Sequence, residues 1–204
     1  MREFEYVEEN LRRLRSSEPA TIVFPCGSCL LMFRRNIPSL VQKGTPLHED
    51  ALWVADRSTD YASFLLASGV VDRLPEPPAG ERAGEIGYHD PCHLSGTLGK
   101  GPEAREVLRR VAGGAFAEME GADRCCGYGG TFNVRDYPTS SRIGEGKVSL
   151  AARGGTKVIS TACSGCVLQI RDMAARVDPS LRVVHIAELV RQALERGGGC
   201  APRR

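Results

Sequence analysis

Apolar residues follow two alternating patterns along this chain, helical spacing and short continuous runs. Four of them recur at helical spacing in residues 3–16: Phe4, Val7, Leu11 and Leu14. This spacing predicts an amphipathic helix. The run Thr-Ile-Val-Phe at 21–24 then predicts a short buried strand, which leads into Pro-Cys-Gly-Ser-Cys at 25–29 and a second apolar helix.

The same criteria predict the remaining elements. Helices are expected from about residue 30, at 47–56, 60–70, 102–112 and 138–153, after residue 166, and at 186–194. Strands are expected at 85–88, 115–119, 157–160 and 182–184. Pro102 suits a first helical turn, and Gly154-Gly155 suit a helix end. Strands that alternate with helices indicate an α/β fold with a largely parallel sheet.

One order of elements occurs twice. Helix, strand, Cys-x-x-Cys and helix follow one another at 3–35 and again at about 140–173. The second copy has a long upstream region with further cysteines, whereas no cysteine precedes Cys26. We therefore expect the end of one repeat followed by a whole second repeat.

This repeat divides the chain into four predicted parts. They are the C-terminal part of a first repeat (1–74), a linker (75–84), a complete second domain (85–196) and a flexible tail (197–204). The linker has three prolines and two glycines in ten positions.

Composition narrows the class of protein. The 204 residues carry a net charge of +2, with 42% hydrophobic and 25% charged residues. This balance is typical of a globular protein and gives no reason to expect a nucleic-acid or membrane-surface partner. No apolar run approaches the roughly 20 residues of a membrane span. The N-terminus has no secretory signal pattern, so we expect the cytoplasm, where cysteines serve as metal ligands, redox groups or core residues.

Five central cysteines lie in loops that suit a metal. Cys92 is followed after 32 residues by Cys125-Cys126, and after 36 more by Cys163-x-x-Cys166. Pro91 stiffens the loop of Cys92, and the glycines after Cys126 allow a tight turn. Cys163 lies between a predicted strand and a predicted helix, and the positive end of the helix dipole favours its thiolate form. Thiolates bind soft metals.

The number of cysteines favours an iron–sulfur cluster over a single ion. Adjacent cysteines cannot easily ligate one tetrahedral zinc together, but they can reach two iron atoms. Five thiolates also exceed the four that a structural zinc takes.

The pattern Cys-x32-Cys-Cys-Gly-x35-Cys-x-x-Cys resembles the CCG, or cysteine-rich, domain family. The resemblance covers roughly residues 5–195 and includes Tyr-His-Asp-Pro-Cys-His at 88–93, Cys-Cys-Gly-Tyr-Gly-Gly-Thr-Phe at 125–132 and Val-His-Ile-Ala-Glu at 184–188. The family includes the cysteine-rich subunit of heterodisulfide reductase, the iron–sulfur subunits of glycolate oxidase and of anaerobic glycerol-3-phosphate dehydrogenase, and the lactate-utilisation A proteins, whose context is the most similar.

The resemblance implies a site and a cofactor. Complete copies in the family bind a non-cubane [4Fe–4S] cluster through five cysteines, which correspond here to Cys92, Cys125, Cys126, Cys163 and Cys166. Cys26 and Cys29 match the end of the motif of the first repeat. The other cysteines of that repeat are missing, so we expect either a truncated reading frame or a partner chain that completes the first site. A reactive, thioredoxin-like dithiol is the alternative for this pair.

The resemblance also implies a function. We expect an electron-transfer subunit that works with flavin-containing or iron–sulfur subunits in the oxidation of a 2-hydroxy acid such as lactate or glycolate. Any membrane association would be made through those partners. Alternatives are the cleavage of a disulfide at the cluster, as in heterodisulfide reductase, and a zinc-stabilised binding module without redox chemistry. The remaining alternative is a set of buried structural thiols.

Three histidines and one further cysteine complete the candidates. His89 and His93 flank Cys92 and either donate hydrogen bonds to sulfur or have a structural role in the loop. His185 is expected to form local hydrogen bonds. Cys200, in the glycine-rich tail, is expected to have no part in the site.

Overall fold

The computed structural model of the chain describes residues 2–77 and 84–197. Its strands form two parallel sheets. The first has two strands, β1 (Ile22–Phe24) and β2 (Ser58–Asp60). The second has three, in the order β3 (Ile86–His89), β4 (Val158–Thr161) and β5 (Arg182–His185). The predicted α/β class with small parallel sheets is confirmed.

Helices make up most of the rest. They are α1 (Arg2–Ser16), α2 (Gly27–Leu31), α3 (Ile37–Leu40), α4 (Pro46–Arg57), α5 (Tyr61–Ala67), α6 (Pro102–Ala112), α7 (Thr131–Arg135), α8 (Tyr137–Arg153), α9 (Ser164–Val177) and α10 (Ile186–Arg196). Two π-helical segments, η1 (Met32–Asn36) and η3 (His93–Thr97), and two 3-10 turns, Val71–Arg73 and Gly113–Ala115, complete the set. None of the helices in the described ranges is both long and apolar enough to cross a membrane.

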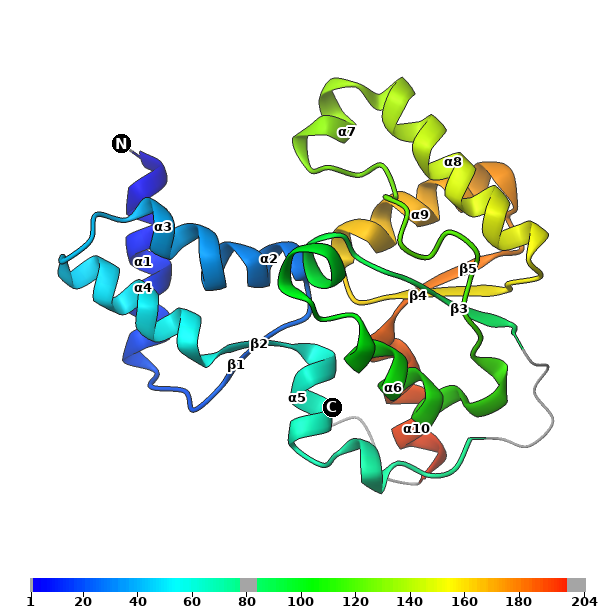
Figure 1. The fold of residues 1–204 in the computed structure, drawn as a ribbon, viewed down its shortest axis with the longest axis horizontal. Helices are drawn as coiled ribbons and strands as arrows, with labels where there is room; N and C mark the ends of the chain where they lie inside the picture. The colour runs from blue at the N-terminus through cyan, green and yellow to red at the C-terminus, as the bar shows by residue number, and fades with distance from the viewer. Residues whose placement is uncertain (1, 78–83, 198–204) are drawn as a thin grey trace.

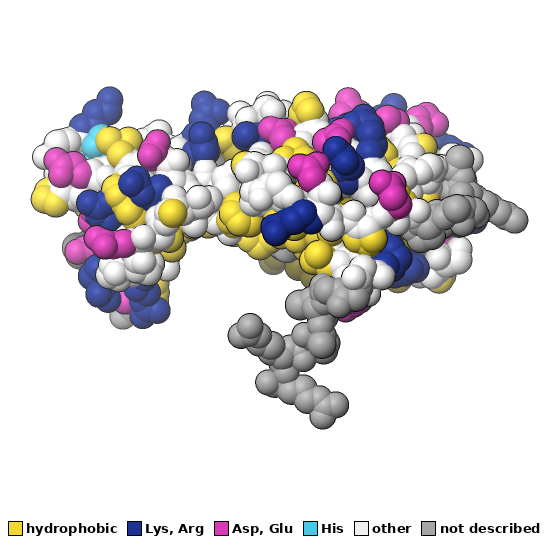
Figure 2. Space-filling view, turned by 90° about the horizontal axis from the view of Figure 1, so that it is seen from below, with side chains coloured by type: hydrophobic (Ala, Val, Ile, Leu, Met, Phe, Trp, Pro, Cys, Tyr) yellow, Lys and Arg dark blue, Asp and Glu magenta, His cyan; other side chains and the backbone are white. Residues whose placement is uncertain are grey.

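The helices enclose the three-stranded sheet. α8 and α9 cover one of its faces, while α6 and α10 cover the other (Figure 1). At the opposite end of the molecule, α1, α3 and α4 form a projecting lobe, and α2 runs from this lobe towards the larger sheet (Figure 1). Basic and acidic side chains are interspersed over the face drawn in Figure 2, with apolar side chains between them.

The internal repeat is visible in the backbone. β1 leads through Cys26 into α2, and β4 leads through Cys163 into α9. Cys26 (φ −141°, ψ 121°) and Cys163 (φ −146°, ψ 120°) cap their helices in nearly the same conformation. In each copy a parallel strand then follows, and its last residue, Asp60 or His185, caps the next helix with its side chain. Among the described residues, the first copy has no counterpart of β3.

Three hydrophobic clusters form the core. The largest joins the two copies, because Leu30 and Leu65 of the first pack with Tyr88, Leu94 and Leu108 of the second. Another cluster lies between the sheet and helices α8 and α9, and the third holds the N-terminal lobe together. The two copies therefore pack against each other directly.

The predicted domain boundaries stay a prediction, and the linker residues 78–83 and the tail residues 198–204 lie outside the described part.

Three local predictions are incomplete or wrong. The predicted strand at 115–119 is absent: Phe116 forms only an isolated parallel bridge to Ile86, because the 3-10 turn at 113–115 sets the direction of the chain just before it. The polar strand β2 was not predicted, since its residues Ser-Thr-Asp carry no apolar signal. The short helix α7 was also missed.

Gly27 tests the packing between the copies. A Cβ atom at Gly27 would lie 2.7 Å from Cγ of the buried Leu94 in η3, so we expect Gly27→Ala to lower the free energy of unfolding by about 1–3 kcal/mol. Gly146, exposed in α8, has no atom within 4 Å of its Cβ position, and Gly146→Ala should raise that free energy by about 0.5–1 kcal/mol. Urea denaturation followed by circular dichroism measures both. Equal changes in the free energy of unfolding for the two variants would contradict the close packing of Gly27 against Leu94.

Candidate metal centre

The candidate site lies at the carboxyl edge of the three-stranded sheet. The parallel register places His89 of β3 beside Thr161 of β4, and Thr161 beside His185 of β5. Cys92 follows the end of β3 by three residues, and Cys163 follows β4 by two. Because β3 and β4 are parallel and in register, the two cysteine loops begin side by side, although 70 residues separate Cys92 from Cys163 in the sequence.

A single pocket of about 330 Å³ collects the predicted ligands. Its lining includes all five central cysteines: Cys92, Cys125, Cys126, Cys163 and Cys166. Cys126, Cys163 and Cys166 are buried, whereas Cys92 and Cys125 are exposed. The pocket thus has a buried floor of three sulfurs and an open rim with two. The structure brings the five residues together, and their role as ligands stays a prediction.

Gly127 gives the Cys125-Cys126 loop its shape. Its φ is +88°, and a Cβ atom there would lie 2.4 Å from the backbone oxygen of Ser140. A side chain is therefore excluded by both conformation and space. The N–H of Gly127 donates to Sγ of Cys125 at 3.3 Å, so the turn also supplies a hydrogen bond to sulfur.

The sulfur atoms are close enough to alter each other's protonation. Hydrogen bonds from the thiols of Cys125 and Cys166 lower the pKa of Cys126. Hydrogen bonds from Cys166 and Cys26 lower the pKa of Cys163, and N–H groups at the start of α9 add to this effect. The same contacts raise the pKa of Cys166. The buried floor of the pocket therefore favours thiolate at two of its sulfurs, which is the form that binds metals.

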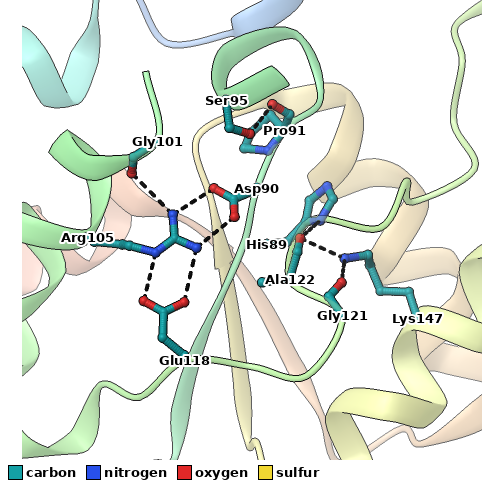
Figure 3. Close-up of polar contacts among 10 residues, drawn as sticks. All are labelled: His89, Asp90, Pro91, Ser95, Gly101, Arg105, Glu118, Gly121, Ala122 and Lys147. Atoms are coloured by element: carbon teal, nitrogen blue, oxygen red, sulfur yellow. Dashed lines mark hydrogen bonds and ion pairs between the residues drawn. The ribbon is translucent and has the colours of Figure 1, made fainter. Parts of the chain in front are cut away.

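An ion-pair network anchors the loop of Cys92. The guanidinium of Arg105, in α6, donates to both carboxylate oxygens of Asp90, at 2.8 and 2.7 Å. It also donates to both oxygens of Glu118, at 2.7 and 3.0 Å (Figure 3). Asp90 is nearly buried and lies two residues before Cys92. The bidentate contact fixes the direction in which the chain leaves β3.

The carbonyl oxygen of Ala122 links three segments around the pocket. It accepts from the Asp90 N–H at 2.9 Å, from Nζ of Lys147 at 3.0 Å and from Nδ1 of His89 at 3.3 Å (Figure 3). Lys147 is buried in α8 and also donates to the carbonyl of Gly121. Burial lowers the pKa of Lys147 to about 8. The segment before Cys125-Cys126 is thus tied to β3 and to α8.

The histidines next to the cysteines differ in their contacts. His89 is buried, and its Nε2 has no hydrogen-bond partner among the described residues. A ring nitrogen of His89 and the Sγ atoms of Cys126 and Cys166 all lie within 4.8 Å of one another. In contrast, Nδ1 of His93 lies 2.8 Å from the hydroxyl of Ser28 in α2.

His185 forms a local hydrogen bond, as predicted, and a long-range one that was not predicted. Its Nε2 donates to the carbonyl of Pro25 at 2.8 Å, and its Nδ1 accepts from the N–H of Ala187.

The remaining cysteines lie at different distances from the pocket. Sγ of the half-buried Cys26 is 3.8 Å from Sγ of Cys163, so the first copy contacts the site of the second. Cys29 is exposed and does not line the pocket. Cys200 lies outside the described residues.

The sequence analysis missed the residues that hold the loops. Arg105, Glu118 and Lys147 resemble ordinary surface charges in the sequence, and only their contacts identify them. Asp90 lies inside the motif at 88–93 and offered the only local signal.

The side chains present fit a metal centre of soft or borderline character. Thiolates and imidazole are the donors such metals prefer. Five sulfurs already exceed the four donors of a structural zinc site. The donor set is therefore large enough for a centre with more than one metal atom.

Parallel strands whose carboxyl edge carries cysteine loops around one pocket define a cysteine-rich domain with a candidate metal site. Sequence comparison agrees with this class. The model of the CCG family, described as a cysteine-rich domain, matches residues 2–34 and 86–171. The chain belongs to the CCG cysteine-rich domain family.

Several curated relatives share one name, Lactate utilization protein A. The protein of that name from Bacillus subtilis (strain 168) is 32% identical over 170 residues, which cover 83% of this chain and 69% of the relative. The protein from Bacillus velezensis is 31% identical over 174 residues, or 85% and 71% of the two chains. The protein from Lysinibacillus sphaericus is 30% identical over 170 residues, or 83% and 72%.

Substitution of Gly127 tests the two reasons for a glycine there, its positive φ and its close approach to Ser140. Gly127→Ala should lower the free energy of unfolding by about 2 kcal/mol or more, because strain from positive φ adds to the clash with Ser140. Gly69, just beyond the end of α5, also has a positive φ, +65°, but open space around its Cβ position, so Gly69→Ala should cost only the strain, about 1 kcal/mol. Thermal or urea denaturation compares the two. A smaller loss at Gly127 than at Gly69 would refute the close approach.

Removal of the Arg105 charge tests the anchor of the Cys92 loop. Arg105→Met leaves Asp90 nearly buried without its partner, so we expect a loss of about 2–3 kcal/mol. This loss of unfolding free energy is small for a broken buried ion pair, because 20% of the Arg105 side chain is exposed to solvent. The double variant Asp90→Asn, Arg105→Met should recover part of it, since no uncompensated buried charge remains: the carboxylate of Glu118, which also loses its partner, is exposed. A double variant less stable than the single one would argue against this pairing.

Proposed function

We propose that this chain is the electron-carrying, cysteine-rich subunit of an oxidoreductase that acts on a 2-hydroxy acid, lactate or glycolate. The proposed cofactor is a [4Fe–4S] cluster held by Cys92, Cys125, Cys126, Cys163 and Cys166. The observation that carries the proposal is the meeting of these five thiols around one pocket. The name shared by the relatives, Lactate utilization protein A, supports the substrate class.

The residues around the pocket suit this task. The buried sulfurs of Cys126, Cys163 and Cys166 hold the inner side of a bound group away from water. The exposed rim at Cys92 and Cys125 leaves one side open to a partner. When bound, an iron–sulfur cluster accepts and releases single electrons. The protein sets the energy of this exchange through burial and through N–H groups directed at sulfur, such as that of Gly127.

The proposal assigns oxidation of the substrate to a partner. A flavin-containing or second iron–sulfur subunit would remove electrons from the hydroxy acid, and this chain would pass them on. We place the complex in the cytoplasm, with any membrane association through the partners. Thiols stay reduced, and so remain able to bind a metal, in such a reducing compartment.

Metal analysis tests the proposal. Protein purified without oxygen should be brown and contain iron and acid-labile sulfide. Cys126→Ser should lose most of the iron, because Cys126 lies on the buried floor of the pocket. Cys200→Ser is the control, since residue 200 lies outside the matched range of the family, and it should retain the iron.

Other outcomes separate the alternatives. Colourless protein with one equivalent of zinc would overturn the electron-transfer proposal in favour of a zinc-stabilised module. Brown protein that reduces an added disulfide without a partner would favour disulfide chemistry at the cluster. Equal iron loss in the Cys126 and Cys200 variants would refute the ligand assignment.

A further inference from the structure

A second hollow, of about 430 Å³, lies beside the thiol pocket, and Cys125 lines both. Four of its eight lining residues are cationic and none is acidic: Arg124, Cys125, Arg142, Ile143, Gly146, Lys147, Leu150 and Arg153. Six of the eight belong to α8, where their spacing places them on one side of the helix. This basic hollow therefore gathers positive charge next to an exposed thiol of the candidate metal centre.

The arginines of the basic hollow have no counter-charge in the described part of the chain. Arginines in α1, α6, α9 and α10 form ion pairs with carboxylates. Arg124, Arg142 and Arg153 are exposed instead, and within residues 2–77 and 84–197 none of them pairs with a carboxylate. Arg142 donates to the hydroxyl of Thr139 at 3.4 Å. Like charges gathered in this way repel one another, so the hollow favours a negatively charged occupant.

Two nearby carboxylates do not supply that negative charge. Burial lowers the pKa of Lys147, and the charges of Asp123 and Asp90 act against this shift. Neither carboxylate lines the hollow, however, and Asp90 is already paired with Arg105. Lys147 is buried, and its Nζ donates to two backbone carbonyls (Figure 3). An incoming molecule would therefore meet the three exposed arginines first.

The composition of the basic hollow suits a protein surface. Ile143 is 40% exposed among the arginines, and protein interfaces combine arginine with apolar area at their centre. Gly146 leaves open space above α8, since no atom lies within 4 Å of its Cβ position. Cδ of Arg124 lies 3.2 Å from the Cβ position of Gly121, so this side chain is packed against the loop. An exposed apolar side chain at the centre fits a protein better than it fits the phosphates of a membrane or a nucleic acid.

We propose that the basic hollow is the docking surface for an acidic face of the protein that exchanges electrons with this chain. This inference rests on the proposed function and adds to it the place where the partner binds and the charge of its surface. Cys125 lies in the wall that the hollow shares with the thiol pocket. A partner seated here would bring its redox group close to the open side of that pocket, and electron transfer is fastest over short distances. Opposite charges also raise the rate of encounter and fix the orientation of the two proteins.

Small redox probes of opposite charge test this route without the partner itself. Full-length protein is loaded with iron and sulfide without oxygen, reduced, and mixed by stopped flow with ferricyanide or with hexaammineruthenium(III). Each probe takes one electron from the reduced protein and is itself reduced by one electron. We expect oxidation by the anionic ferricyanide to slow as salt is added, and to slow about tenfold in Arg142→Glu, Arg153→Glu at low salt. The cationic ruthenium probe should react faster with that variant.

The double variant Lys157→Glu, Arg182→Glu is the matched control. Both residues are exposed at the amino ends of β4 and β5, whereas the cysteine loops follow the carboxyl ends. The control therefore has the same net charge as the test variant but leaves the basic hollow intact, and it should change the ferricyanide rate much less. Equal changes in the two double variants would show that only net charge acts on the probe, which would overturn the inference.

Binding of an acidic chain tests the hollow independently of the metal. A dye-labelled hexaglutamate peptide is titrated with the purified full-length protein and followed by fluorescence anisotropy. The dissociation constant should rise about tenfold in Arg142→Glu, Arg153→Glu. It should rise several-fold in Gly146→Phe, which keeps every charge but fills the hollow. An affinity that either variant leaves unchanged would contradict docking in the hollow. Tighter binding to phosphatidylserine vesicles or to duplex DNA than to the peptide, lost in the same variants, would assign the arginines to phosphate and overturn the protein partner.

Failure of this inference differs from failure of the proposed function. Protein that contains iron and sulfide, but whose two double variants behave alike, would keep the function and overturn the docking surface. Colourless zinc protein whose affinity for the acidic peptide depends on the hollow would overturn the electron-transfer function, while the surface for an acidic partner would stand. Protein without iron whose peptide affinity does not depend on the hollow would overturn both.

Discussion

The carbonyl oxygen of Ala122 is the point on which the geometry of the thiol pocket depends. It receives hydrogen bonds from the backbone of Asp90, from the buried Lys147 and from the ring of His89. Asp90 precedes Cys92 by two residues, and Ala122 precedes Cys125 by three. One acceptor therefore sets the distance between two cysteine loops that are far apart in sequence. Because the donors include a buried cation and a buried ring, this contact is shielded from competition by water.

The repeated architecture adds a second level of organisation. Both copies use a strand, a cysteine at the helix N-cap and a helix, with the same backbone conformation at Cys26 and Cys163. The first copy does not stand apart from the site of the second. His185 holds the carbonyl of Pro25, and the neighbouring Cys26 lies in sulfur contact with Cys163. Movement of one copy relative to the other would therefore disturb the thiol pocket directly.

The sequence predicted what depends on local pattern and failed where tertiary contacts decide. Helices such as α6 and α8 were found within a residue or two, because apolar spacing and glycine or proline ends are local signals. The prediction of a strand near Phe116 was wrong. The apolar residues there would allow strand pairing, but the chain forms a turn followed by a single bridge to Ile86. Among the site residues, cysteine spacing carried the information. Arg105 and Lys147 could not be recognised, since their importance comes from partners 15 and 25 residues away.

Charge explains why a pocket built in this way suits a bound cationic group. Three buried sulfurs lie close enough to alter one another's pKa, so the thiolate form of one depends on a proton held by its neighbour. Lys147 supplies one buried positive charge nearby, and its lowered pKa shows that burial opposes even this charge. Simultaneous ionisation of the three buried thiols would leave an excess of buried negative charge, which is costly at low dielectric. A multivalent metal centre would compensate the negative charges of all these sulfurs together. Protonation also removes the charge of a sulfur, but a protonated sulfur no longer binds a metal.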